Sequence, residues 1–103
     1  MYKLIYFVPT SHKEVTKEAL FAIGAGQYPM YENVCFETLG TGQFQPTSEA
    51  TPFIGESNVL ERVEEYRVEM VCKDELIKQA VAVLQNTHPY EIVAYDVIKL
   101  EDI

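Results

Sequence analysis

Four segments of the chain combine alternating or β-branched apolar residues with flanking turn residues, and this pattern predicts β-strands. The first covers residues 2–8 and ends at Pro9, which cannot donate a hydrogen bond to a sheet. The second covers residues 34–44, the third 59–72 and the last 90–100. Proline and glycine residues separate the second segment from the third, so we expect these two to pair as a long hairpin.

Two further stretches carry apolar residues at helical spacing. In the first, Ser11 is a good N-cap with Glu14 three positions later, as in a capping box, and Gly24 ends the helix. In the second, Asp74 is the expected N-cap and the helix ends near Asn86. The apolar stripes are Val15, Ala19, Ala22 and Ile23 in the first helix, and Ile77, Ala80, Val81 and Leu84 in the second.

The order strand, helix, strand, strand, helix, strand predicts a single α+β domain over residues 1–103. Right-handed crossovers fold this order into a ferredoxin-like βαββαβ sandwich, in which a four-stranded antiparallel sheet carries both helices on one face. A chain of this length has room for one core, and a small domain gains stability from association.

The predicted sheet is apolar on both faces. In the first strand Leu4, Tyr6 and Val8 point to one side, whereas Ile5 and Phe7 point to the other, and the last strand is apolar on both sides as well. Two helices cover only one face of a sheet. We therefore expect identical subunits to cover the second face, so that the protein is a homo-oligomer.

The chain is acidic, with a formal net charge of −8 from 16 acidic and 8 basic side chains. This charge disfavours nucleic acid and anionic membrane surfaces as partners. No apolar run approaches the roughly 20 residues of a membrane span, and the N-terminus lacks the layout of a signal peptide, so we expect a cytoplasmic protein. Cys35 and Cys72 are too few and too far apart for a disulfide framework, which favours reduced, buried thiols. Pairing of the second and third strands would bring Cys35 roughly opposite Cys72, so a redox pair is the minor alternative.

Candidate chemistry gathers at one edge of the predicted sheet. There His12, His88 and Glu91 come together, with Glu49 and Glu56 on the neighbouring loop. Imidazole and carboxylate groups suit a divalent metal ion such as zinc or copper, so the first three residues are candidate metal ligands.

Each of these residues also has a structural interpretation. His12 suits a solvated position in a first helical turn, and His88 before Pro89 suits a hydrogen bond to a turn. In the following residues, Pro89 would fix the entry into the strand, the ring of Tyr90 would pack against apolar neighbours, and Glu91 would anchor a neighbouring backbone or subunit.

Other classes of site find less support. The Gly40-Thr41-Gly42 run lacks the glycine that a dinucleotide motif needs at position 45, where Gln45 stands. The loop 46–58 contains no lysine or arginine to neutralise a phosphate. A nucleophile with an oriented base is not evident, so the chain is more simply explained without catalysis.

Several spaced motifs resemble a known family. They are His88-Pro89-Tyr90-Glu91, Gly24-Ala25-Gly26, Cys35-Phe36, the run from Gly40 to Pro46, and Ile54-Gly55. Together they resemble the inserted domain of the YqfO, or Nif-three-like, proteins, a relative of CutA and of PII signalling proteins. The resemblance implies the ferredoxin-like fold and a trimer whose sheets pack inward. Longer Nif-three-like proteins resemble metal-dependent enzymes through outer segments, and we expect this chain to be a stand-alone equivalent of the insert.

Three functions follow as hypotheses. The first is a non-enzymatic, oligomeric binding or regulatory module that senses a small ligand or a divalent metal. The second is a structural or interaction protein without a ligand. The third is a small metal-assisted hydrolase that uses Glu91 as base and the two histidines as ligands.

Overall fold

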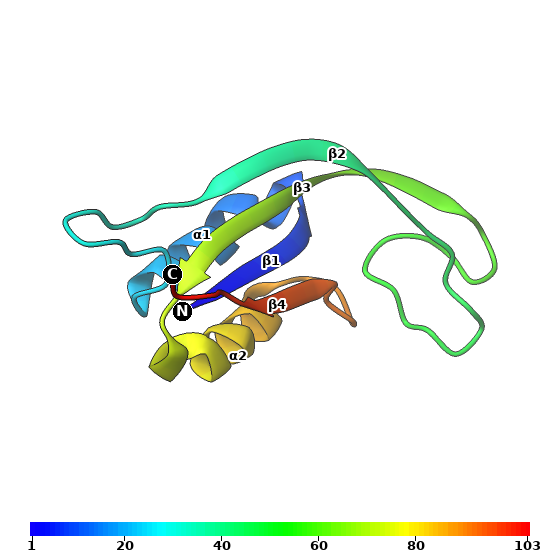
Figure 1. Cartoon of the computed structure of the whole chain (residues 1–103). Helices are drawn as coiled ribbons and strands as arrows, with labels where there is room; N and C mark the ends of the chain where they lie inside the picture. Colours follow the sequence, from blue (N-terminus) through cyan, green and yellow to red (C-terminus); the bar gives the residue numbers. More distant parts are fainter.

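The computed structural model describes residues 1–103 and contains the expected elements in the expected order (Figure 1). The four strands form one antiparallel sheet in the order β2-β3-β1-β4. The strands are β1 (Tyr2–Pro9), β2 (Phe36–Phe44), β3 (Glu61–Cys72) and β4 (Tyr95–Lys99). The helices are α1 (Lys13–Ala22) and α2 (Ile77–Thr87), which follow the short 3-10 turns η1 (Thr10–His12) and η2 (Asp74–Leu76). The predicted α+β, ferredoxin-like fold is confirmed.

One hydrophobic core lies between the sheet and the two helices. Leu4 pairs with Met70 and Tyr6 with Val68, so these side chains share one face of the sheet. All four are buried against Leu20, Ile77, Ala80 and Leu84 of the helices. The stripe predicted for α2 therefore faces the core as expected.

The phase of α1 differs from the prediction. The helix begins at Lys13, and Ser11 does not cap it but bonds to His12, with Oγ 2.8 Å from Nδ1. Thr16 and Leu20 face the core, whereas Val15 is half exposed. The 3-10 turn after β1 sets this orientation, and the Thr16 hydroxyl, 2.9 Å from the Tyr6 hydroxyl, fits a polar pair into the core.

Asp74 does not cap α2 either. Its carboxylate instead bonds to the N-terminal amine of Met1 and, at 2.8 Å, to Nζ of Lys99. The amide of Leu100 also donates to the carbonyl of Met1 at 3.0 Å. The N- and C-terminal ends of the chain therefore lie at the same corner of the sheet (Figure 1).

The face of the sheet away from the helices is apolar in its middle and charged around it. Ile5 and Val71 are buried there, and Ile98 and Phe36 are 48% and 68% exposed. The register also places Lys3, Arg67, Glu69 and Asp96 on this face. The prediction of a second apolar face thus holds for the centre of the sheet, while its surroundings are more polar than expected.

The hairpin of β2 and β3 extends beyond the rest of the sheet (Figure 1). Residues 45–60 form the loop at its end, and the amide of Asn58 donates to the carbonyl of Pro46 at 2.6 Å to close it. β4 begins only at Tyr95, later than predicted, because residues 88–94 first turn towards this loop. None of the helices has the length and apolar character needed to cross a bilayer.

Candidate functional site

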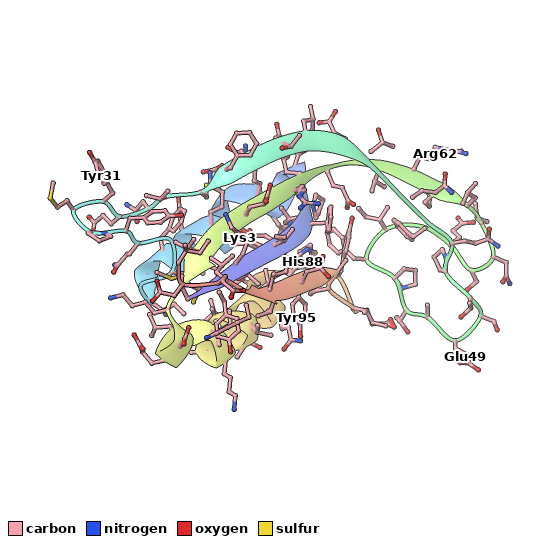
Figure 2. All side chains as sticks on the ribbon, viewed as in Figure 1. Lys3, Tyr31, Glu49, Arg62, His88 and Tyr95 are labelled. Carbon is pink, nitrogen blue, oxygen red and sulfur yellow. The ribbon has the colours of Figure 1, made fainter.

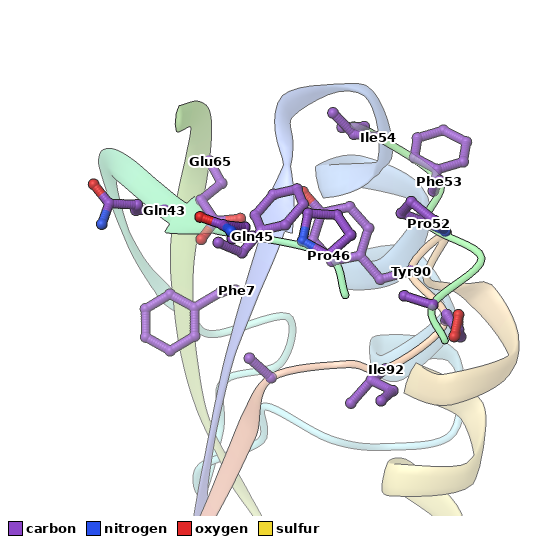
Figure 3. Close-up of a pocket in the computed structure, with 14 residues that line it drawn as sticks. Phe7, Gln43, Gln45, Pro46, Pro52, Phe53, Ile54, Glu65, Tyr90 and Ile92 are labelled. Carbon is purple, nitrogen blue, oxygen red and sulfur yellow. The ribbon is translucent and has the colours of Figure 1, made fainter. Parts of the chain in front are cut away.

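A pocket of about 280 Å³ opens between the loop 45–60 and the end of the sheet (Figure 3). Its walls come from segments far apart in the sequence. β1 supplies Phe7, the end of β2 supplies Phe44, the loop supplies Phe53, β3 supplies Glu65, and the turn before β4 supplies Tyr90. Most of the lining is apolar, so the site offers an apolar surface with only a few polar groups.

Tyr90 is the centre of an aromatic cluster in this pocket. Its ring centroid lies 6.2 Å from that of Phe44, 6.4 Å from Phe53 and 4.8 Å from the imidazole of His88. His12 meets Phe53 edge-on at 5.6 Å. These separations are within the range of favourable aromatic pairs, so the cluster helps to hold the loop against the sheet.

The imidazole of His88 is buried and uses both of its nitrogens. Nδ1 lies 3.1 Å from the amide of Tyr90, which can only donate, so Nδ1 is the acceptor. Nε2 therefore carries the proton and donates to the carbonyl of Phe7 at 2.7 Å. Burial lowers the pKa of His88, and the nearby charge of His12 lowers that pKa further. The neutral imidazole thus links β1 to the segment that precedes β4 through two hydrogen bonds.

Glu91 anchors the loop. Its carboxylate accepts a hydrogen bond of 2.8 Å from the amide of Thr51, 40 residues away in the sequence. This contact matches the structural interpretation of the His-Pro-Tyr-Glu run, in which the histidine bonds to the backbone, the tyrosine packs and the glutamate holds a neighbouring segment.

A polar pair lies at the base of the pocket. The hydroxyl of Tyr90 is buried beside the carboxylate of Glu65, and no well-aligned hydrogen bond joins the two groups. Burial and the charge of Glu65 raise the pKa of Tyr90 to about 12. Burial also raises the pKa of Glu65, which has no cation as a partner. Figure 3 shows both side chains directed into the same space.

Glu65 is not among the site residues that the sequence predicts. The glycine at position 42 was a sign of this close approach in the sequence. In the structure a Cβ at Gly42 would lie 2.1 Å from Oε1 of Glu65, so only glycine leaves room for that carboxylate. A glycine in the middle of a strand is a sign of such a close approach. The glutamate that occupies the space could be assigned only once the strand register was known.

The predicted metal ligands lie at the same end of the sheet but do not form a ligand cluster. His12 contacts Phe53, His88 bonds to two backbone groups, and Glu91 bonds to the loop backbone. No group of three potential metal-binding side chains occurs in the structure. Glu49 lies at the outer tip of the loop, well away from His88 (Figure 2). Metal binding stays a prediction, and it requires His88 to give up one of its hydrogen bonds.

Cys35 and Cys72 are both free thiols. Cys72 is buried, as expected, and burial raises the pKa of each thiol. Phe36 pairs with Glu69, so the register does not place Cys35 opposite Cys72 as the sequence suggested. The strand register therefore gives no support for a redox pair.

Comparison with known proteins identifies the relatives of this fold. No family model matches the sequence. The GTP cyclohydrolase 1 type 2 homolog of Halalkalibacterium halodurans is 40% identical over 100 residues, which are 97% of this chain and 27% of that protein. The structure of a Bacillus cereus protein related to NIF3 matches with a TM-score of 0.83 and 38% identity, over 98% of this chain and 26% of that one. The chain is a relative of one segment of these proteins.

The resemblance to the Nif-three-like proteins that the sequence motifs indicated is thus confirmed. The chain spans about a quarter of the length of the curated relatives it matches. The PII-like protein CutA from Nostoc, in its apo form, matches with a TM-score of 0.63 at 13% identity, over 98% of this chain and 82% of that one. At this low identity the CutA match establishes the shared fold.

Proposed function

We propose that this chain is a non-catalytic binding or regulatory module, and that its ligand is a small molecule held in the pocket beneath the loop 45–60. The observation that carries the proposal is the buried hydroxyl of Tyr90 beside the carboxylate of Glu65, a polar pair in an otherwise apolar pocket. Small-molecule sites typically combine apolar walls with a few convergent polar groups that fix the orientation of the ligand. A volume of about 280 Å³ suits a small metabolite.

The contacts of the serine and histidine side chains support a module that is not catalytic. The serine–histidine contact between Ser11 and His12 joins neighbours in the sequence at an exposed position, outside the pocket lining. His88 is held in one neutral form by two backbone groups and is therefore poorly placed to transfer a proton.

A screen of small-molecule fragments by two-dimensional NMR tests the proposal. Binders should shift the resonances of Phe44, Phe53 and Tyr90 and should lose at least roughly tenfold in affinity in Ala50→Trp, which fills the pocket. Ala82→Trp on the exposed side of α2 is the matched control and should bind normally. If no fragment binds at these residues, or if Ala50→Trp binds as well as the control, the protein has no ligand here and a purely structural role takes precedence.

The proposed module is a homo-oligomer in the cytoplasm, with a trimer as the expected form. The exposed apolar residues Phe36 and Ile98, on the sheet face that the helices leave open, support association. The fold shared with CutA and the free thiols are consistent with this setting.

Divalent metal sensing is the second candidate function. It is favoured by one observation, which is that His12 and Glu91 contact the same loop and His88 packs against Tyr90, which also contacts it. Under this proposal zinc or copper displaces a hydrogen bond of His88, and saturable binding is lost in His88→Ala. If isothermal titration finds no saturable binding of either ion to the purified protein, metal sensing and metal-assisted hydrolysis are both excluded.

A further inference from the structure

The charged side chains that line the pocket are both acidic. Glu65 and Glu91 line it, and no lysine, arginine or histidine does. The loop 46–58 that covers it also has no basic residue. Because the two carboxylates and the net charge of −8 repel anions, an anionic ligand such as a phosphate is disfavoured.

The two carboxylates are not equivalent. Glu91 already accepts the amide hydrogen of Thr51 at 2.8 Å, which fixes it in the wall. Glu65 has no ion-pair partner and lies partly buried beside the buried hydroxyl of Tyr90. An ionised carboxylate that is removed from water gains stability from a positive partner, so Glu65 favours a cation in the pocket.

The remaining walls are of a kind that also attracts cations. Phe7, Phe44, Phe53 and Tyr90 surround the pocket, and the faces of their rings carry partial negative charge. Phe7 already has a cation near it, because the guanidinium carbon of Arg67 lies 5.9 Å from its ring centroid on the neighbouring part of the sheet. A metal ion gains little from such walls because it needs several oxygen, nitrogen or sulfur ligands. An organic cation has an apolar body that fits them.

We infer that the pocket binds a small organic cation, either a quaternary ammonium or a protonated amine with apolar substituents. This inference rests on the proposed function as a binding module and specifies the chemical class of its ligand. The apolar substituents contact the aromatic rings, and the positive charge lies next to the carboxylate of Glu65.

Choline and its neutral carbon isostere, 3,3-dimethylbutan-1-ol, are the probes that test it. The two have nearly the same shape and differ in charge. Titrations followed by NMR should show that choline shifts the resonances of Phe44, Phe53 and Tyr90 and binds roughly tenfold or more tightly than the alcohol. Glu65→Gln should reduce this preference to near unity, whereas Glu64→Gln, an exposed neighbour outside the pocket lining, should keep it.

Each other outcome overturns the inference in an identifiable way. If both probes bind equally, the pocket is a ligand site without charge selection, and the proposed function stands alone. If choline binding is absent, or is weakened equally by Glu65→Gln and Glu64→Gln, organic cations are not the ligand class. The proposed function itself fails only in the fragment screen, when no neutral or charged fragment binds at the pocket. Near-ultraviolet circular dichroism verifies that both variants are folded.

Discussion

The buried imidazole of His88 shows how much one residue contributes to the shape of the pocket. It joins the end of β1 to the turn before β4 through two hydrogen bonds of 2.7 and 3.1 Å. Because Nδ1 can accept the amide hydrogen of Tyr90 only in the neutral ring, protonation of Nδ1 breaks that contact, while Nε2 keeps its hydrogen bond to the carbonyl of Phe7. The stability of the protein is therefore linked to pH through this residue.

We expect the protein to lose stability as the pH falls below about 6.5, the usual pKa of histidine in an unfolded chain. The pKa of His88 is lowered in the folded state, so the unfolded chain binds the proton first and is favoured. Urea unfolding at about pH 7.5 and about pH 5.5 should show the decrease, which for one proton is at most about 1.4 kcal/mol per pH unit.

The variant His88→Gln isolates this contribution. The pKa of Glu65 is raised by burial, so that group has the opposite pH dependence, but it is present in both proteins. The variant should be less stable at neutral pH and should lose the part of the pH dependence that belongs to His88. An unchanged pH dependence in the variant would show that His88 does not titrate between the folded and unfolded states.

At the scale of elements, α1 is the clearest difference between sequence and structure. An apolar stripe through Val15 predicts one face of the helix towards the core, but the inward residues are Thr16 and Leu20. The hydrophobic pattern is weak here because the core position is filled by a threonine, which pairs with the hydroxyl of Tyr6 at 2.9 Å. No local pattern predicts that pair, since the two residues meet only after β1 and α1 pack.

Thr16→Val should destabilise the protein by about 1–3 kcal/mol, because it leaves the buried hydroxyl of Tyr6 without a partner. Val15→Thr, the matched change on the exposed side of the same helix, should alter the free energy of unfolding by less than about 0.5 kcal/mol. Chemical denaturation of both variants measures the difference. If Val15→Thr is the more damaging change, the helix has the phase that the sequence predicted.

The loop 45–60 is the second element that the sequence does not determine. The hairpin that carries this loop is predictable from the sequence, because β2 and β3 are each long and uninterrupted strands that pair along their length. The position of the loop over the pocket depends instead on contacts with residues 12, 90 and 91, which are distant in the chain. The sequence thus predicts that the candidate residues lie at one end of the sheet, whereas it does not predict the pocket itself.

Glu91→Ala should release this loop. It removes the bond between its carboxylate and the amide of Thr51, and hydrogen bonds to charged groups contribute roughly 1.5–3 kcal/mol. Hydrogen exchange at Thr51 should become roughly ten- to a hundredfold faster, while exchange in β1 stays unchanged. Glu101→Ala, an exposed change near the C-terminus, is the control, and equal exchange rates in the two variants would mean that Glu91 does not hold the loop.

At the scale of the whole molecule, the proposed oligomer depends on association through the sheet face that the helices leave open. Phe36 shares this face with Ile5 and is 68% exposed. Tyr31 has the same exposed fraction but lies at the tip of the loop 23–35, beyond the end of the sheet (Figure 2). The two aromatic residues therefore form a matched pair for testing association.

Phe36→Glu should dissociate the assembly, because it places a charge in the surface proposed to be buried between subunits. Sedimentation should show a fall in mass of about threefold if the assembly is a trimer. Tyr31→Glu should sediment like the unmodified protein. A monomer for the unmodified protein at micromolar concentration would refute the oligomer, and an equal effect of both variants would place the interface elsewhere.

The contact between Met1 and Leu100 has a consequence for how such a fold is used. A domain whose two ends lie close together can be inserted into a surface loop of a larger protein without disrupting the fold of that protein. Proteins about four times as long, which match this chain over only 26–27% of their own length, have room for such a unit within a longer chain.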